Sequence, residues 1–220
     1  MRKVLLCVVT NGRAEVSLTT AISMLRVQSK LVSTPQPPFS IEMTFLGTLD
    51  EALNAGWKAG ADAVFAVEGT VGFDADFLWE AMASGLPVVV GTYPLPVVDW
   101  ERVKTRPESE TPQFWGNVYN ATLKDSLKNG YALCEAAELG MVVVQREALQ
   151  KIADAHPDIV DAEGNACFAA PGVYAGQRAT ASQRFLRLFG DPVWADIRRG
   201  GTCTGPTEFG GCVGARTVLR

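Results

Sequence analysis

Several sequence patterns that would assign a chain to a common class are missing here. The sequence has no G-x-G-x-x-G and no P-loop, so neither common nucleotide-binding fingerprint is present. No segment reaches the roughly 18 continuous apolar residues that span a membrane. The N-terminal run MRKVLLCVVTNG is too short for the apolar core of a signal peptide and has no small-residue cleavage site. We therefore expect no membrane span, and we interpret this run as a buried first strand.

Cysteine and histidine are too scattered or too few to form a recognisable framework. The five cysteines are odd in number and include no C-x-x-C pair. This usage fits a reducing compartment better than a disulfide framework, so we expect a cytoplasmic protein. The single histidine, His156, precedes a proline at the end of an apparent helix, where a surface histidine is the usual case.

The charge balance gives no reason to expect a polyanionic partner. The net charge is −4, which points to neither nucleic acid nor an anionic membrane surface. The length of 220 residues and the hydrophobic content of 47% suit one globular domain with a substantial core. Arginines gather late in the chain, where they could hold a phosphate-bearing ligand or form an ordinary solvated face: Arg184, Arg187, Arg198 and Arg199.

What the sequence does contain is an alternation of apolar, β-rich runs with helical stretches. Strands are expected at Lys3–Val9, Ile41–Leu46, Ala63–Val67, Val88–Gly91, Tyr131–Cys134 and Met141–Gln145. Helices are expected at Glu15–Val32, Leu49–Ala59, Asp74–Ser84 and Arg146–His156. The chain from Asp158 on is less regular, with one amphipathic stretch at Ala181–Phe189. The stretch 97–120 is the least regular and could be a mobile loop. This order predicts a single α/β domain with a mostly parallel sheet and helices on both faces.

The segment 61–94 is the most informative, because it predicts strand, loop, helix and strand in turn. It places Glu68-Gly69-Thr70 directly after the apolar strand, where an acidic residue has few structural reasons to be. Ligands of open α/β sheets bind beyond the carboxyl ends of the strands. Glu68 is therefore a candidate for holding a metal or a sugar.

Four segments share their order with one enzyme family. They are Ala52–Ala55 before GADAVFAVEG, then GLPVVVGTYPLPVVDWERV, then EAAELGMVVVQR, and finally GDPVWAD. Together they resemble the nucleotide-sugar glycosyltransferases of the glycosyltransferase-A fold, especially the short single-domain transferases of phages, large viruses and bacteria. The resemblance implies a single glycosyltransferase-A-like, Rossmann-like domain. Residues 1–96 would be its nucleotide-binding half, and residues 97–220 its acceptor half with an irregular C-terminal region.

The resemblance also implies a divalent metal, Mn²⁺ or Mg²⁺, held by an Asp-x-Asp pair against the diphosphate of a nucleotide-sugar donor. This pair falls on Glu68-Gly69-Thr70, so Glu68 is retained as a ligand while Thr70 offers only a neutral hydroxyl. The late histidine ligand of the family falls near Cys203-Thr204-Gly205-Pro206, which contains no histidine. The implied metal site is therefore degenerate.

The catalytic base that the resemblance implies is missing from its usual window. No Asp or Glu lies between Gly164 and Gly190, so a carboxylate from elsewhere would have to deprotonate the acceptor. The available substitutes are Asp99, Glu135, Glu138, Asp191 and Asp196. We predict Glu135 or Asp191 as the replacement, and Glu135 matches an acidic position of the family.

Contacts to the two substrates complete the predicted site. Donor contacts are expected at Thr10, Asn11, Asn54, Asp62, Glu68 and Thr70, and acceptor contacts at Tyr93, Asp99 and Trp100. Each has a structural alternative, such as a strand-ending turn, a helix-face asparagine or aromatic core packing. Trp115, in the irregular stretch, is a further recognition candidate.

Two functional hypotheses remain at this point. In the first, the chain transfers a sugar from a nucleotide-diphosphate donor to an unknown acceptor. In the second, it is a catalytically inactive relative that serves as a binding or structural module, in an assembly, in a host cytoplasm or in a virus particle. The resemblance favours the first hypothesis, whereas the joint loss of half the metal pair, the late histidine and the base favours the second.

Overall fold

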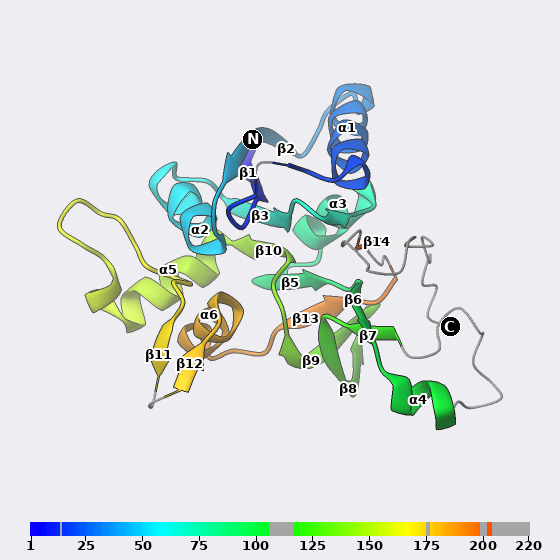
Figure 1. Cartoon of the computed structure of the whole chain (residues 1–220). Helices are drawn as coiled ribbons and strands as arrows, with labels where there is room; N and C mark the ends of the chain where they lie inside the picture. Colours follow the sequence, from blue (N-terminus) through cyan, green and yellow to red (C-terminus); the bar gives the residue numbers. More distant parts are fainter. Residues whose placement is uncertain (14, 106–116, 175–176, 199–201, 204–220) are drawn as a thin grey trace.

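The apolar runs of the sequence form one eight-stranded sheet in the computed structural model, which describes residues 1–13, 15–105, 117–174, 177–198 and 202–203 (Figure 1). The strand order is β2-β1-β3-β10-β5-β13-β9-β8. The strands in this order are β2 Phe39–Leu46, β1 Arg2–Val9, β3 Ala63–Glu68, β10 Met141–Gln145, β5 Val88–Gly91, β13 Trp194–Asp196, β9 Tyr131–Ala137 and β8 Ala121–Lys128.

Most strands of this sheet point in one direction. Strand β1 pairs in parallel with β2 and β3, and β13 pairs in parallel with β5. Strand β10 is antiparallel to both β3 and β5, and β9 is antiparallel to both β13 and β8. The other six strands therefore run the same way, which confirms the predicted mostly parallel sheet.

Three short strand pairs lie outside the main sheet. They are β4 Val71–Gly72 with β14 Thr202–Cys203, β6 Pro94–Val98 with β7 Asn117–Tyr119, and β11 Gly172–Tyr174 with β12 Gln177–Ala179. The expectation of an irregular stretch at 97–120 was wrong at both ends, because β6 pairs with β7 and helix α4 (Trp100–Thr105) follows β6. Residues 106–116, including Trp115, lie outside the described residues.

Helices cover both faces of the sheet, as the alternating pattern predicts (Figure 1). Helices α1 (Leu18–Ser33) and α3 (Ala75–Ala83) pack on one face, and α2 (Leu49–Lys58), α5 (Arg146–Ala155) and α6 (Ala181–Phe189) pack on the other. A short 3-10 helix, η2 (Pro157–Ile159), follows α5. Helix α1 begins later than predicted, because the Ser17 side chain accepts a hydrogen bond from the Thr20 amide and so caps the helix.

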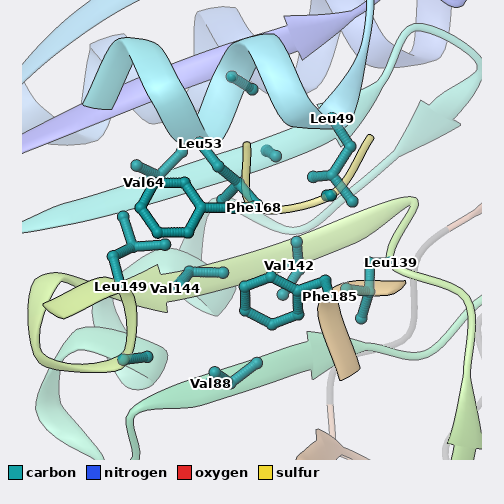
Figure 2. Packing of buried hydrophobic residues seen from close by; sticks show 14 of the residues in the cluster. Leu49, Leu53, Val64, Val88, Leu139, Val142, Val144, Leu149, Phe168 and Phe185 are labelled. Atoms are coloured by element: carbon teal, nitrogen blue, oxygen red, sulfur yellow. The ribbon is translucent and has the colours of Figure 1, made fainter. Parts of the chain in front are cut away.

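The central strands are buried on both faces, which explains their unbroken apolar sequences. In β1, Val4, Leu6 and Val8 contribute to the core beneath α1 and α3, while alternate residues enter the core beneath α2, α5 and α6. Figure 2 shows part of this second core, in which side chains of β3, β5 and β10 meet those of the helices: Val64, Val88, Val142 and Val144 with Leu49, Leu53, Leu149 and Phe185.

The chain changes direction across the sheet between β1 and β3. From β1 the chain passes through α1 to β2, toward one edge of the sheet. From β3 it passes through α3 to β5, toward the opposite edge. Adjacent parallel strands whose connections diverge in this way leave a crevice beyond their carboxyl ends, where ligands bind in open α/β sheets. Among the described residues, no helix combines the length and the apolar character needed to cross a membrane.

Candidate functional site

The first wall of this crevice is a tight turn at the end of β1. Asn11 and Gly12 both have positive φ angles, 50° and 76°, and the Arg13 amide donates to the Thr10 carbonyl oxygen at 3.0 Å. Two consecutive positive φ angles are the pattern of a type I′ turn, for which Asn-Gly is the favoured sequence. The Thr10 amide also donates to the Leu46 carbonyl oxygen at 2.9 Å, which fixes the turn to the end of β2.

The second wall is the Glu68-Gly69-Thr70 corner at the end of β3. The Glu68 amide donates to the Gly140 carbonyl oxygen at 2.7 Å, and the Gly69 amide donates to the Val9 carbonyl oxygen at 2.9 Å. From α1, the buried Thr20 hydroxyl donates to the Gly69 carbonyl oxygen at 2.9 Å. The backbone that carries the Glu68 carboxyl is therefore held from three sides.

The two walls meet through their side chains. The Asn11 amide Nδ2 donates to Glu68 Oε1 at 3.3 Å. Beside this contact lies a small hollow of about 70 Å³, lined by residues that follow β1 and β3: Val9, Thr10, Asn11, Arg13, Glu15, Glu68, Gly69 and Thr70. The predicted contacts Thr10, Asn11, Glu68 and Thr70 are thus brought together.

Tyr93 and Glu68 converge over Gly140. A Cβ atom placed on Gly140 would overlap the Tyr93 hydroxyl and would lie 3.0 Å from Glu68 Cδ. Tyr93 is buried, and its amide donates to Asn120 Oδ1 at 2.8 Å. Only a residue without a side chain at position 140 therefore allows the phenol and the carboxyl to approach each other here.

Glu138 is the next carboxyl group along this rim. Its amide donates to the Asn120 carbonyl oxygen at 2.7 Å, and its own carbonyl oxygen accepts from Asn120 Nδ2 at 3.1 Å. The following residue, Leu139, donates its amide to Ser182 Oγ at 2.9 Å, which places the start of α6 beside this loop. The Glu138 side chain is exposed.

The electrostatics of Glu68 reflect these neighbours. Burial is the largest influence and raises the pKa of Glu68 above its ordinary value of 4.5. The hydrogen bond from Asn11 lowers this pKa, the negative charge of Glu138 raises it, and the positive charge of Arg13 lowers it. The net result is a raised pKa. Asn11, Glu138 and Arg13 therefore all influence the charge of this carboxyl.

The donor set here does not fit a divalent metal site of the kind that the resemblance implies. Among the described residues, no group of three or more His, Cys, Asp or Glu side chains converges to hold a metal ion. Asn11 directs an N–H toward the oxygen that would coordinate the metal, and the charge of Arg13 acts on the same carboxyl. Hard divalent cations need several oxygen ligands. Among the described residues that line this hollow, two carry a carboxylate, Glu68 and Glu15.

Other predicted donor contacts lie elsewhere. Asp62 precedes β3 and accepts a hydrogen bond from the Lys3 amide at 2.6 Å. Because a strand rises roughly 3.3 Å per residue, Asp62 lies about 20 Å from Glu68 at the other end of β3. Asn54 accepts from the Ala166 amide at 2.9 Å, and this bond attaches α2 to a distant loop. Both side chains have structural partners away from the crevice.

Neither of the two predicted bases lines the hollow at Glu68. Asp191 forms an ion pair with Lys151 of α5 and precedes β13, which runs parallel to β5, so it lies toward the opposite end of the sheet. Glu135 is exposed on β9, beside an irregularity in the pairing of β9 with β8. It is Glu138, another carboxyl of the same sequence segment, whose charge acts on Glu68.

The remaining predicted residues either do not line the hollow at Glu68 or lie outside the described residues. Asp99 accepts from the Glu101 amide at 3.0 Å at the start of α4, and the adjacent Trp100 is 67% exposed. Arg198 is bound by Asp196 and Glu80, so it does not serve the crevice. His156 ends α5 as expected, and Arg199 and residues 204–206 lie outside the described residues.

A much larger hollow of about 810 Å³ opens at the other end of the sheet, around Asp62 and Arg146. Its lining mixes acidic and basic side chains, and two of these already have partners: Lys151 pairs with Asp191, and Arg146 lies over the Trp57 ring. It also lies at the amino ends of the parallel strands, where ligands of open α/β sheets do not usually bind. The smaller hollow at Glu68 is therefore the better candidate site.

Two residues whose charges act on Glu68 were not selected from the sequence. Arg13 could have been found from Thr10-Asn11-Gly12-Arg13, because the Asn-Gly pair predicts a tight turn that returns the next residue toward the strand end. Glu138 was one of five available carboxylates, and no local signal distinguished it from Glu135.

Comparison with known proteins supports the fold and leaves the site open. No protein-family model matches the chain, and no curated protein matches it in sequence. The crystal structure of A197 from STIV superposes with a TM-score of 0.50 and 15% identity, covering 91% of this chain and 84% of that one. At that identity the similarity shows a shared fold alone.

Two further structures are more distant. A UDP-glucose pyrophosphorylase complexed with UDP-glucose has a TM-score of 0.45 and 8% identity, covering 91% of this chain and 92% of that one. HddC from Yersinia pseudotuberculosis complexed with GMP-PN has a TM-score of 0.39 and 8% identity, with 89% of each chain covered. The protein is an α/β protein with a mostly parallel sheet, helices on both faces and a polar crevice at the divergence of β1 and β3.

Proposed function

We propose that this chain binds a nucleotide-diphosphate sugar at the Glu68 crevice and transfers the sugar to an acceptor. The observation that carries the proposal is the meeting of Asn11 and Arg13, which follow β1, with Glu68, which follows β3, at the divergence of these strands. The ordered sequence segments that resemble glycosyltransferases of the glycosyltransferase-A fold support the same conclusion.

Glu68 and Asn11 are suited to sugar recognition. A carboxylate oxygen accepts hydrogen bonds from ribose or hexose hydroxyls, and the Asn11 amide supplies both a donor and an acceptor. Because both side chains sit on backbone fixed by hydrogen bonds, they would be held in place before the ligand arrives.

Glu138 is the carboxylate best placed to act as base. In the proposed reaction, Glu138 takes the proton of an acceptor hydroxyl while the oxygen of that hydroxyl forms a bond to the anomeric carbon of the sugar. The bond from that carbon to the phosphate oxygen breaks, and its electron pair leaves with the nucleoside diphosphate. Glu135 and Asp191 remain the predictions made from sequence. Glu138 is favoured over both because it lies two residues before Gly140, where Glu68 and Tyr93 converge, and because its charge acts on Glu68.

Binding is the first test of this proposal. Calorimetry with uridine, guanosine, adenosine and cytidine diphosphates should show binding of at least one to the wild-type chain. Glu68→Gln should weaken that binding, whereas Asp62→Asn, at the other end of the same strand, should not. If none of the four binds, or if the two variants behave alike, the proposal fails and the inactive scaffold becomes the better account.

Turnover is the second test. With the nucleotide that binds, release of nucleoside diphosphate from its sugar conjugates should fall by about 10²- to 10⁴-fold in Glu138→Gln, the usual contribution of a general base. Glu135→Gln, three residues earlier in the chain, should retain wild-type turnover. The opposite result would assign the base to Glu135.

A further inference from the structure

We infer that Arg13, rather than a divalent cation, neutralises the diphosphate of the ligand in this crevice. The inference rests on the proposed function, because it names the group that binds the phosphates of the proposed donor. It goes further in assigning the site to phosphate binding that needs no metal.

The first step is the chemistry of the residues that face the hollow. Its acids are Glu68 and Glu15, and the Glu68 oxygen nearest Asn11 already accepts an N–H. No metal-binding group of three side chains exists among the residues that the structure describes. Arg13 is the one cationic side chain among the described residues that line the hollow, so a phosphate group bound here would find its positive partner in Arg13.

The second step is the position of Arg13. The type I′ turn fixes its backbone through the bond from its amide to the Thr10 carbonyl oxygen. Its side chain lines the hollow and is exposed. Its positive charge lowers the pKa of Glu68.

Several other basic side chains of the fold already form ion pairs. Lys3 pairs with Glu42, Lys30 with Asp76, Lys151 with Asp191, and Arg198 with Glu80. Within the described part of the chain, no ion pair at salt-bridge distance involves Arg13. Arg13 can therefore engage a ligand without first breaking an internal ion pair.

The third step is the match between this group and a diphosphate. A guanidinium presents parallel N–H donors that bind two phosphate oxygens at once, and it stays charged at every physiological pH. Placed at the phosphate, it also stabilises the negative charge that develops on the leaving nucleoside diphosphate. These are the two tasks that a divalent metal performs in the enzymes that this sequence resembles.

The test measures binding of the four nucleoside diphosphates and of inorganic pyrophosphate in EDTA and in Mn²⁺. Wild-type affinity in EDTA should lie within about twofold of that in Mn²⁺. Arg13→Gln should weaken binding about tenfold or more, the scale of a lost charged hydrogen bond, and Arg13→Lys should recover part of it. Arg2→Gln, at the other end of β1, is the matched control and should bind as the wild type does.

The outcomes separate this inference from the proposed function. Binding that appears only with Mn²⁺ and is unchanged in Arg13→Gln overturns the role of Arg13 and leaves the proposed function standing. Absence of binding by every probe in both conditions overturns both. Melting curves of Arg13→Gln and Arg2→Gln establish that both variants are folded, and equal losses of affinity in the two would also overturn the inference.

Discussion

At the scale of single residues, the position of Glu68 in the crevice carries an energetic cost. A carboxyl whose folded-state pKa is raised binds its proton more tightly in the native state than in the unfolded state. Stability is therefore lost as the pH rises from the ordinary pKa of 4.5 toward the raised native value. An acid retained at such a cost, with no ion pair at salt-bridge distance among the described residues, is typical of a binding or catalytic site.

This cost predicts the behaviour of Glu68→Gln. The amide keeps an oxygen that can accept from Asn11 but carries no charge, so the variant should have a higher melting temperature than the wild type at pH 7. At pH 4, where the wild-type carboxyl is protonated, the two should melt together. Thermal melts monitored by circular dichroism across pH 4–8 measure the difference. A variant that is less stable than the wild type at pH 7 would contradict the argument.

At the scale of elements, local patterns predicted most of the strands and helices correctly. Apolar β-branched runs predicted β1, β3, β5 and β10, and the expected helix Leu49–Ala59 matches α2 to within one residue. The start of α1 was placed too early, because the Ser17 cap depends on a loop that the Gly69 carbonyl oxygen holds in place. The pairing of β6 with β7 was missed because their partner residues are separated by a long intervening segment.

The junction of β10 with the loop after β5 predicts the effect of Gly140→Ala. The new methyl group would overlap the Tyr93 hydroxyl, and Tyr93 is buried, so relief requires backbone movement. Overpacking of this kind costs about 1–3 kcal/mol. Removing the hydroxyl in Tyr93→Phe should restore part of this loss, so the double variant should be more stable than the sum of the single variants predicts. Urea unfolding of the three variants and the wild type measures this coupling, and strictly additive losses would argue against the clash.

At the scale of the whole molecule, the site depends on contacts that no local pattern specifies. Strand β10 enters antiparallel between β3 and β5, which precede it in the chain by more than 50 residues. This insertion carries Gly140 and Glu138 to Glu68. The sequence predicted Glu68 and the Asn11 turn, because each follows its own strand directly. The influence of the Glu138 charge on Glu68 could not be predicted in this way, because it depends on which loop β10 brings back to the crevice.

Asn120 joins the three segments that make this arrangement, and it gives the last prediction. Its side chain accepts from the Tyr93 amide at 2.8 Å and donates to the Gly91 and Glu138 carbonyl oxygens at 3.0 and 3.1 Å. Asn120→Ala leaves the Tyr93 amide and the Gly91 and Glu138 carbonyl oxygens without these partners. A buried polar group left unsatisfied costs roughly 1–3 kcal/mol, so we expect the variant to lose about 2–4 kcal/mol of stability.

Because Asn120 does not line the hollow at Glu68, any loss of ligand affinity in Asn120→Ala must act through the position of Tyr93 and Glu138. Chemical unfolding should show the loss of stability, and calorimetry below the unfolding transition should show weaker nucleoside diphosphate binding. Thr122→Ala, two residues later on β8 and exposed, should change neither quantity. Unchanged binding in a destabilised Asn120→Ala would mean that the crevice keeps its geometry without this junction, and that β1 and β3 alone define the site.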